Sequence, residues 1–194
     1  MIPLMLTAML VDFFSAIIAI AIAYYAYRVY RLTAFKSMMF FYSGFLLLGT
    51  IFLIRGIVSF MAFLAPRRIE LIIYKNLALI YTAGISLSYL LIAISYSFEE
   101  LKKEPIEGFI VFLINPFSEI ISCTILLYIL FRMVTGSRPS LYILTGFTLM
   151  FLHHLSGLAF LCLRNPSLYL VSRIIQLAAF SLISLQLYKM GREK

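Results

Sequence analysis

The chain has 194 residues, of which 63% are hydrophobic and 12% charged, and its mean hydropathy is +1.04. Soluble domains are about half apolar and about a quarter charged, so this composition excludes an ordinary water-soluble fold. The net charge of +8 comes from 16 Lys and Arg residues that stand singly or in pairs between apolar runs. Such a distribution favours contact with lipid headgroups, and we expect no nucleic-acid partner.

The apolar runs predict membrane-spanning helices along the whole chain. Each run approaches or exceeds the roughly 20 residues that cross hydrocarbon as a helix. Breaks at charged residues, Pro and Gly place the spans at about 8–30, 38–64, 71–97, 108–131, 140–163 and 168–189. We therefore predict an all-α integral membrane protein, a multi-pass six-helix transmembrane bundle that forms a single domain over residues 1–194.

The connections between the predicted spans are short, so we expect helices that follow one another in sequence to be antiparallel neighbours. The longest connection, 98–107, carries six charged residues around Pro105 and is interpreted as a solvated linker. It divides the chain into two halves of three spans each, 8–97 and 108–190.

The two halves share landmarks in the same order. Phe14-Ser15 aligns with Phe117-Ser118, and Gly44-Phe45 aligns with Gly146-Phe147 after a one-residue shift. Chance matching of apolar spans is the alternative explanation. If the repeat is real, an odd number of spans per half predicts two inverted three-helix repeats with a site between them.

The positive charges decide the orientation in the membrane only weakly. With six spans both termini share one side, where seven Lys and Arg residues lie near the span ends against six on the other side. The balance leans towards termini in the cytoplasm.

Ionisable residues inside the spans point to the functional region. A charge at the bilayer centre costs about 2.5 kcal/mol or more, so each one needs a partner or a watery cavity. Counting about 1.5 Å per residue from the termini side, Arg55 lies roughly 14 Å deep and Glu119 roughly 18 Å deep. We predict that Arg55 and Glu119 form an ion pair.

Three further residues extend this predicted central group. His153 and His154 lie about 20 Å deep in the fifth span, and Arg173 about 24 Å deep in the sixth. The group is either a substrate or ion pathway or a structural connection that holds helices in register. Asp12 and Lys75, both near the termini side, form a second predicted pair at the interface.

Adjacent histidines suggest haem or a metal, and the geometry argues against both. Neighbours on a helix point about 100° apart, so His153 and His154 cannot ligate opposite faces of one iron, and only a haem shared across a dimer remains. A metal site would need Glu119 and a further ligand from Cys123 or Asp12, at unsuitable depths. We expect neither cofactor nor metal.

The function hypotheses are of two classes. No catalytic or nucleotide-binding motif occurs, so we expect that the chain is not an enzyme. The first hypothesis is a small transporter or channel for a solute or ion with a polar site near the midplane. The second is a non-catalytic membrane subunit, anchor or sensor module. The bilayer is the expected partner in both, with a homodimer or a larger membrane complex as the further possibility.

Overall fold

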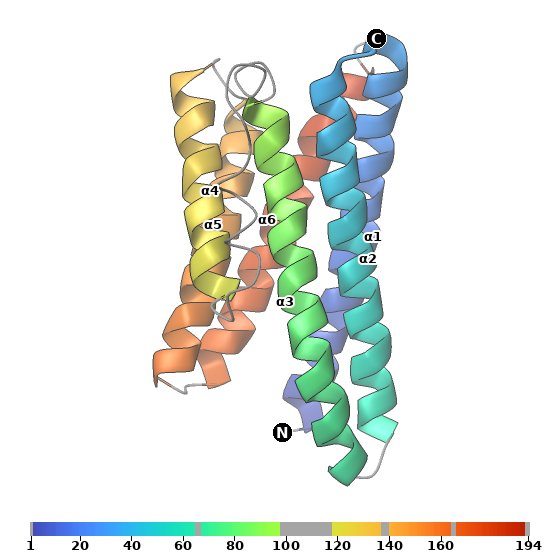
Figure 1. Ribbon diagram of the computed structural model, residues 1–194, viewed down its shortest axis with the longest axis vertical. Coiled ribbons are helices and arrows are strands. Elements are labelled where there is room, and N and C mark those ends of the chain that lie inside the picture. The colour runs from blue at the N-terminus through green and yellow to red at the C-terminus, as the bar shows by residue number, and fades with distance from the viewer. Residues whose placement is uncertain (1, 65–66, 98–117, 137–139, 164–165, 193–194) are drawn as a thin grey trace.

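The computed structural model describes residues 2–64, 67–97, 118–136, 140–163 and 166–192. Within these ranges the side chains of residues 2–5, 62–63, 67–79, 118, 161, 166 and 191–192 are not described. The described part is entirely helical and contains six helices, which Figure 1 shows as one elongated bundle. They are α1 (Ile2–Thr33), α2 (Lys36–Leu64), α3 (Arg67–Ser97), α4 (Ser118–Thr135), α5 (Leu141–Leu163) and α6 (Pro166–Arg192).

Five segments of these helices are long and apolar enough to cross a membrane. They are Leu6–Thr33, Lys36–Met61, Ile80–Ser97, Leu141–Phe160 and Ser167–Met190. This makes the chain a multi-pass membrane protein and confirms the predicted helical class. The remaining helix, α4, begins at Ser118, and residues 108–117 of the predicted fourth span lie outside the described residues.

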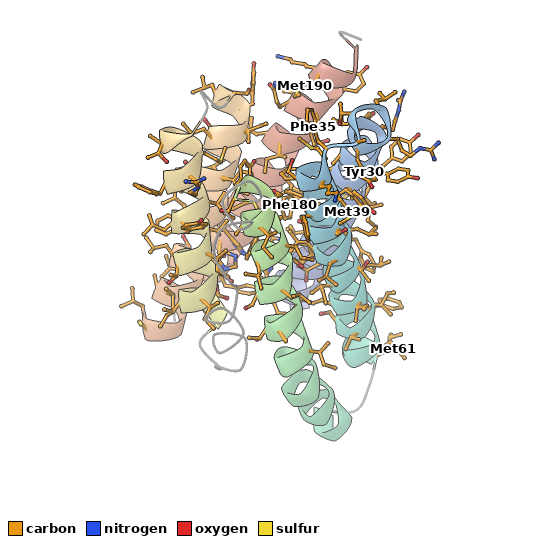
Figure 2. The ribbon with its side chains drawn as sticks, turned by 45° about the horizontal axis from the view of Figure 1, so that its top comes forward. Tyr30, Phe35, Met39, Met61, Phe180 and Met190 are labelled. Atoms are coloured by element: carbon orange, nitrogen blue, oxygen red, sulfur yellow. The ribbon has the colours of Figure 1, made fainter. Side chains whose placement is uncertain are left out.

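Large apolar side chains cover the outside of the bundle as well as its centre. Phe180 is fully buried, whereas Met61 is 60% exposed. Figure 2 labels Phe180 within the bundle and Met61 near the end of α2. A protein surface in water does not carry such side chains throughout, but a surface in contact with lipid tails does.

Small residues let α1 and α2 approach closely. Ala16, Ala19, Ala23 and Ala26 recur on one face of α1 and are all buried. Opposite them, a Cβ atom on Gly49 would lie 3.2 Å from the backbone oxygen of Ala16. The two backbones therefore pack as small-residue helix pairs do in membranes.

The same kind of contact joins the second and third helices of each half. A Cβ on Gly44 of α2 would meet Ile92 and the backbone oxygen of Ser88 in α3. A Cβ on Gly146 of α5 would meet Ile183 and the backbone oxygen of Ala179 in α6. The two glycines that align in sequence thus seat the third helix of each half against the second.

Interhelical contacts give the direction of α4. Tyr89 of α3 and Glu119 of α4 lie at the same level, since both bond His154. About two turns further along both helices, the hydroxyls of Ser97 and Tyr128 are 2.7 Å apart. Helices α3 and α4 therefore run in the same direction, and the expectation that sequential helices are antiparallel is wrong at this point.

Helices α1 and α6 also run in the same direction. Asp12 contacts Arg173, and further along both helices Tyr25 packs against Tyr188. By contrast, α1 and α2 are antiparallel, because Asp12 meets Arg55 while Tyr27 meets Tyr42.

These helix directions contradict the predicted inverted three-helix repeats. In the described helices the order up, down, up is the same in α1–α3 and in α4–α6, so the second half is not inverted relative to the first. The pairs α1·α6 and α4·α3 then occupy matching places in the bundle. Figure 1 correspondingly shows the start of α1 and the end of α6 at opposite ends, which corrects the expectation that both termini share one side.

The close contact at Gly44 can be tested by adding one methyl group. Gly44→Ala brings a Cβ within 2.9 Å of a backbone oxygen that cannot rotate away, and we expect the free energy of unfolding in detergent to fall by about 1–3 kcal/mol. The matched control is Gly56→Ala on the same helix, where the nearest atoms to the new Cβ belong to the ring of Phe13 at 3.2 Å. An equal loss in both variants would contradict the close packing of α2 on α3.

Candidate functional site

The carboxylate of Asp12 is shared by two arginines from different helices. Asp12 is 1% exposed on α1. Its Oδ2 lies 3.1 Å from Nε of Arg55 on α2, and its Oδ1 lies 3.4 Å from Nη1 of Arg173 on α6. This carboxylate therefore joins three helices, one of which is far away in sequence.

Aromatic side chains complete the surroundings of Arg55. Its Nη2 donates a hydrogen bond to the Tyr169 hydroxyl at 2.8 Å. Its guanidinium carbon lies 4.3 Å from the centre of the Tyr81 ring, where the negative face of the ring attracts the cation. Helix α3 contributes to the group through Tyr81.

Arg173 occupies the other side of Asp12. Its Nη1 also donates to Oε1 of Gln176 at 2.8 Å, and its guanidinium lies 5.0 Å from the centre of the Tyr169 ring. One carboxylate faces two guanidinium groups here. The Asp12–Arg55–Arg173 group thus carries a formal charge of +1.

A second chain of hydrogen bonds runs through His154 of α5. Its Nδ1 lies 2.6 Å from Oε2 of Glu119 on α4, and its Nε2 lies 2.8 Å from the hydroxyl of Tyr89 on α3. An ionised carboxylate only accepts hydrogen bonds, so Nδ1 of His154 donates to Glu119, and in the neutral imidazole Nε2 accepts from the tyrosine. The chain leads from Glu119, whose side chain is 28% exposed, to the fully buried Tyr89.

A glycine makes room for the Glu119 carboxylate. A Cβ on Gly157 of α5 would lie 3.2 Å from Oε2 of Glu119. Since Gly157 lies on the same helix as His154, α5 presents both the space and the hydrogen-bond partner to this carboxylate.

His153 connects α5 to α6 beside the arginines. Its Nδ1 lies 2.8 Å from the backbone oxygen of Ser172 and 2.7 Å from the Ser172 hydroxyl, which in turn donates to the backbone oxygen of His153 at 3.1 Å. The two histidine rings pack against each other with centres 4.7 Å apart. Because Ser172 immediately precedes Arg173, this contact links the two hydrogen-bonded groups.

Together these side chains form one polar cluster inside the bundle. We use the name polar cluster for Asp12, Arg55, Tyr81, Tyr89, Glu119, His153, His154, Tyr169, Ser172, Arg173 and Gln176.

The structure brings the five sequence-predicted residues of the central group into this cluster, but with different partners. The predicted Arg55–Glu119 ion pair is wrong, because Arg55 pairs with Asp12 and Glu119 with His154. Asp12 joins the centre rather than a pair at the interface, and the side chain of Lys75 lies outside the described residues.

Two errors in the estimated depths explain the wrong pairs. Helix α1 begins at Ile2 rather than near residue 8, so Asp12 lies about 15 Å from its start, level with Arg55 at about 14 Å from the end of α2. Helix α6 begins at the same end of the bundle as α1. Arg173 is therefore about 10 Å from that end rather than 24 Å.

Sequence reasoning did not identify the tyrosines of the cluster or Gln176. Tyr169 stands at the start of its predicted span and resembles an interfacial tyrosine. Tyr81 and Tyr89 lie well inside the predicted span 71–97, where a phenol hydroxyl usually needs a hydrogen-bond partner. Gln176 carried a usable signal, since an amide in mid-span three residues after Arg173 lies on the same face of the helix.

The donors in the cluster do not assemble a metal site. Both nitrogens of His154 and Nδ1 of His153 bond protein atoms. Within the described residues no three His, Cys, Asp or Glu side chains are grouped as metal ligands.

Comparison with protein-family models, with curated proteins and with solved structures gave no match. The argument for function therefore depends on the polar cluster itself.

The central role of Asp12 predicts a large effect on stability. Asp12→Asn leaves the buried Arg173 and the part-buried Arg55 without their carboxylate, and we expect the free energy of unfolding to fall by about 3–5 kcal/mol. Unfolding in detergent, followed by circular dichroism, measures the change. Arg28→Gln removes an exposed charge and is the control; we expect it to change stability by less than about 1 kcal/mol. A loss of similar size in both would contradict the role of Asp12.

Proposed function

We propose that this chain is a small transporter or channel that moves a small solute or ion through the membrane by way of the polar cluster. The observation that carries the proposal is the buried ionic centre around Asp12. Ionisable groups inside a membrane are expensive, and they mark ion or substrate pathways when several gather at one level. Here they come from all six helices, with Asp12, Arg55, Glu119 and Arg173 as the charged members.

The Glu119–His154–Tyr89 chain supports ion coupling. Histidine is the side chain whose ordinary pKa lies nearest to neutral, so it gains or loses a proton at moderate pH. The charged and titratable groups around this chain are Arg55 and Arg173 across the cluster, and Cys123 on α4.

The site lies between helices of the two halves. Asp12 and Arg55 belong to the first half, and Arg173, His154 and Glu119 to the second. A site between two halves can open towards either side when the halves rock against each other. The order of helix directions in this bundle is the one expected for halves related by an axis along the membrane normal, as in transporters built from parallel repeats.

Glu119→Gln is the direct test of the proposal. The variant keeps the shape of the side chain and removes its charge, so we expect ion flux, or the pH dependence of that flux, to be lost while the protein remains folded. Flux is measured in proteoliposomes containing KCl, with proton and chloride movement followed by trapped dyes. Glu99→Gln, which removes a charge from the predicted linker, is the control and should retain flux. Unchanged flux in Glu119→Gln would contradict a role for this carboxylate.

The alternative function is a non-catalytic membrane subunit in which the cluster only holds helices together. The observation in its favour is that both oxygens of Asp12 are paired, which fixes α1, α2 and α6 in register. One double variant separates the two functions. Glu119→Met combined with His154→Leu removes both partners, and such replacements are often neutral for stability.

A folded double variant without flux supports transport. A folded double variant with full flux shows that the pair only connects helices. Absence of proton and chloride flux in the unmodified protein would overturn the ion-transport proposal and favour the subunit.

A further inference from the structure

One nitrogen of the Arg55 guanidinium is left without a partner. Nε pairs with Asp12 and Nη2 bonds Tyr169, but Nη1 is buried and makes no hydrogen bond to the described residues. Buried polar groups in proteins are nearly always hydrogen-bonded, and an unsatisfied charged donor is especially costly. The position therefore calls for an acceptor that the protein chain does not supply.

The same imbalance occurs on the other side of Asp12. Nε of Arg173 and Nε2 of Gln176 are also buried donors without a partner among the described residues. The two residues are 5% and 1% exposed. With two guanidinium groups and one carboxylate, this part of the cluster has more donors than acceptors and a net positive charge. Both properties favour an anion.

A small cavity lies beside the Arg55 side chain. It has a volume of about 10 Å³ and is lined by Ile51, Ile54, Arg55, Ile80 and Tyr81. Ile54 and Ile80 are 39% and 56% exposed, so the cavity lies near the outer surface of the bundle between α2 and α3. A volume of this size holds about one water-sized particle.

We propose that the cavity beside Arg55 binds one small monovalent anion of halide size. The positive charge of the group repels a cation. A phosphate or a multi-atom carboxylate is too large for the cavity. Apolar isoleucine walls with a guanidinium donor suit an anion that sheds its water readily. Binding at this site stands independently of transport, whereas the identification of the halide as the transported ion rests on the proposed function.

The first experiment measures thermal unfolding of the purified protein in detergent. Sodium chloride is titrated against sodium gluconate at constant ionic strength, because gluconate is too large for the cavity. A ligand that binds only the folded protein raises its melting temperature in a saturable way. We expect chloride and bromide to raise the melting temperature by several degrees and gluconate to have no effect.

Two variants locate the effect at the cavity. Ile54→Phe fills the space without changing any charge, and Arg55→Lys keeps the charge but removes the free Nη1. In both we expect the chloride-dependent rise to disappear. Arg28→Gln, which removes an exposed arginine elsewhere, should retain the full rise. An equal rise in all four proteins would show a general salt effect and overturn the proposal.

A second measurement keeps the proposal testable if neither cavity variant folds. Broadening of the chloride NMR signal by the unmodified protein, reversed by bromide but not by gluconate, is the expected result. Absence of broadening together with an unchanged melting temperature would show that a water molecule suffices at Arg55 and would overturn halide binding. Saturable binding without chloride flux in proteoliposomes would leave the site in place and remove the halide from the proposed transport.

Discussion

The pairing of the Asp12 carboxylate is the interaction on which the rest of the bundle depends. A charge in this position has lipid outside the protein and apolar side chains around it, so it is tolerated only with partners at hydrogen-bond distance. Those partners come from α2 and α6. The two contacts fix the position of each helix along its axis and its rotation about that axis. Apolar packing alone specifies such positions weakly in a membrane, because lipid tails are as apolar as leucine. The small alanine side chains on one face of α1 let the helices approach closely, and Asp12 fixes their relative positions along the bundle.

The directions of the helices determine which residues meet in the polar cluster. Because α6 begins at the same end of the bundle as α1, an arginine near the start of α6 reaches an aspartate in the first half. Because α3 and α4 run alongside each other, Tyr89 and Glu119 approach His154 at one level. In an inverted arrangement these contacts would not form, and Arg173 would lie at the far surface. The polar cluster is therefore a consequence of how the two sets of three helices are oriented.

The sequence alone indicated the membrane class, the approximate positions of the helices and most of the ionisable residues that lie inside, whereas Asp12 was predicted at the interface. Length and hydropathy determine these properties, and they need no information from distant parts of the chain. The partners of Arg55 and Glu119 could not be obtained in this way. Pairing depends on the direction of each helix, and one extra or missing crossing inverts every depth that follows it. The aligned glycines Gly44 and Gly146 did indicate a real packing feature, since each seats a neighbouring helix. The inverted orientation, inferred from the odd number of spans per half, was wrong because α3 and α4 run in the same direction.

Gly157 shows how a residue without chemistry of its own can belong to a site. It follows Gly146 by eleven residues, as Arg55 follows Gly44, so the two occupy matching places on the second helix of each half. At both places this helix meets a carboxylate from the first helix of its half. Arg55 brings a positive charge to Asp12, whereas Gly157 has no side chain and leaves room for Glu119. In the first half the carboxylate therefore pairs with an arginine of the second helix, and in the second half it fits beside a glycine of that helix and binds a histidine. Arg55 and Gly157 therefore contribute to the polar cluster in different ways from matching places in the two halves.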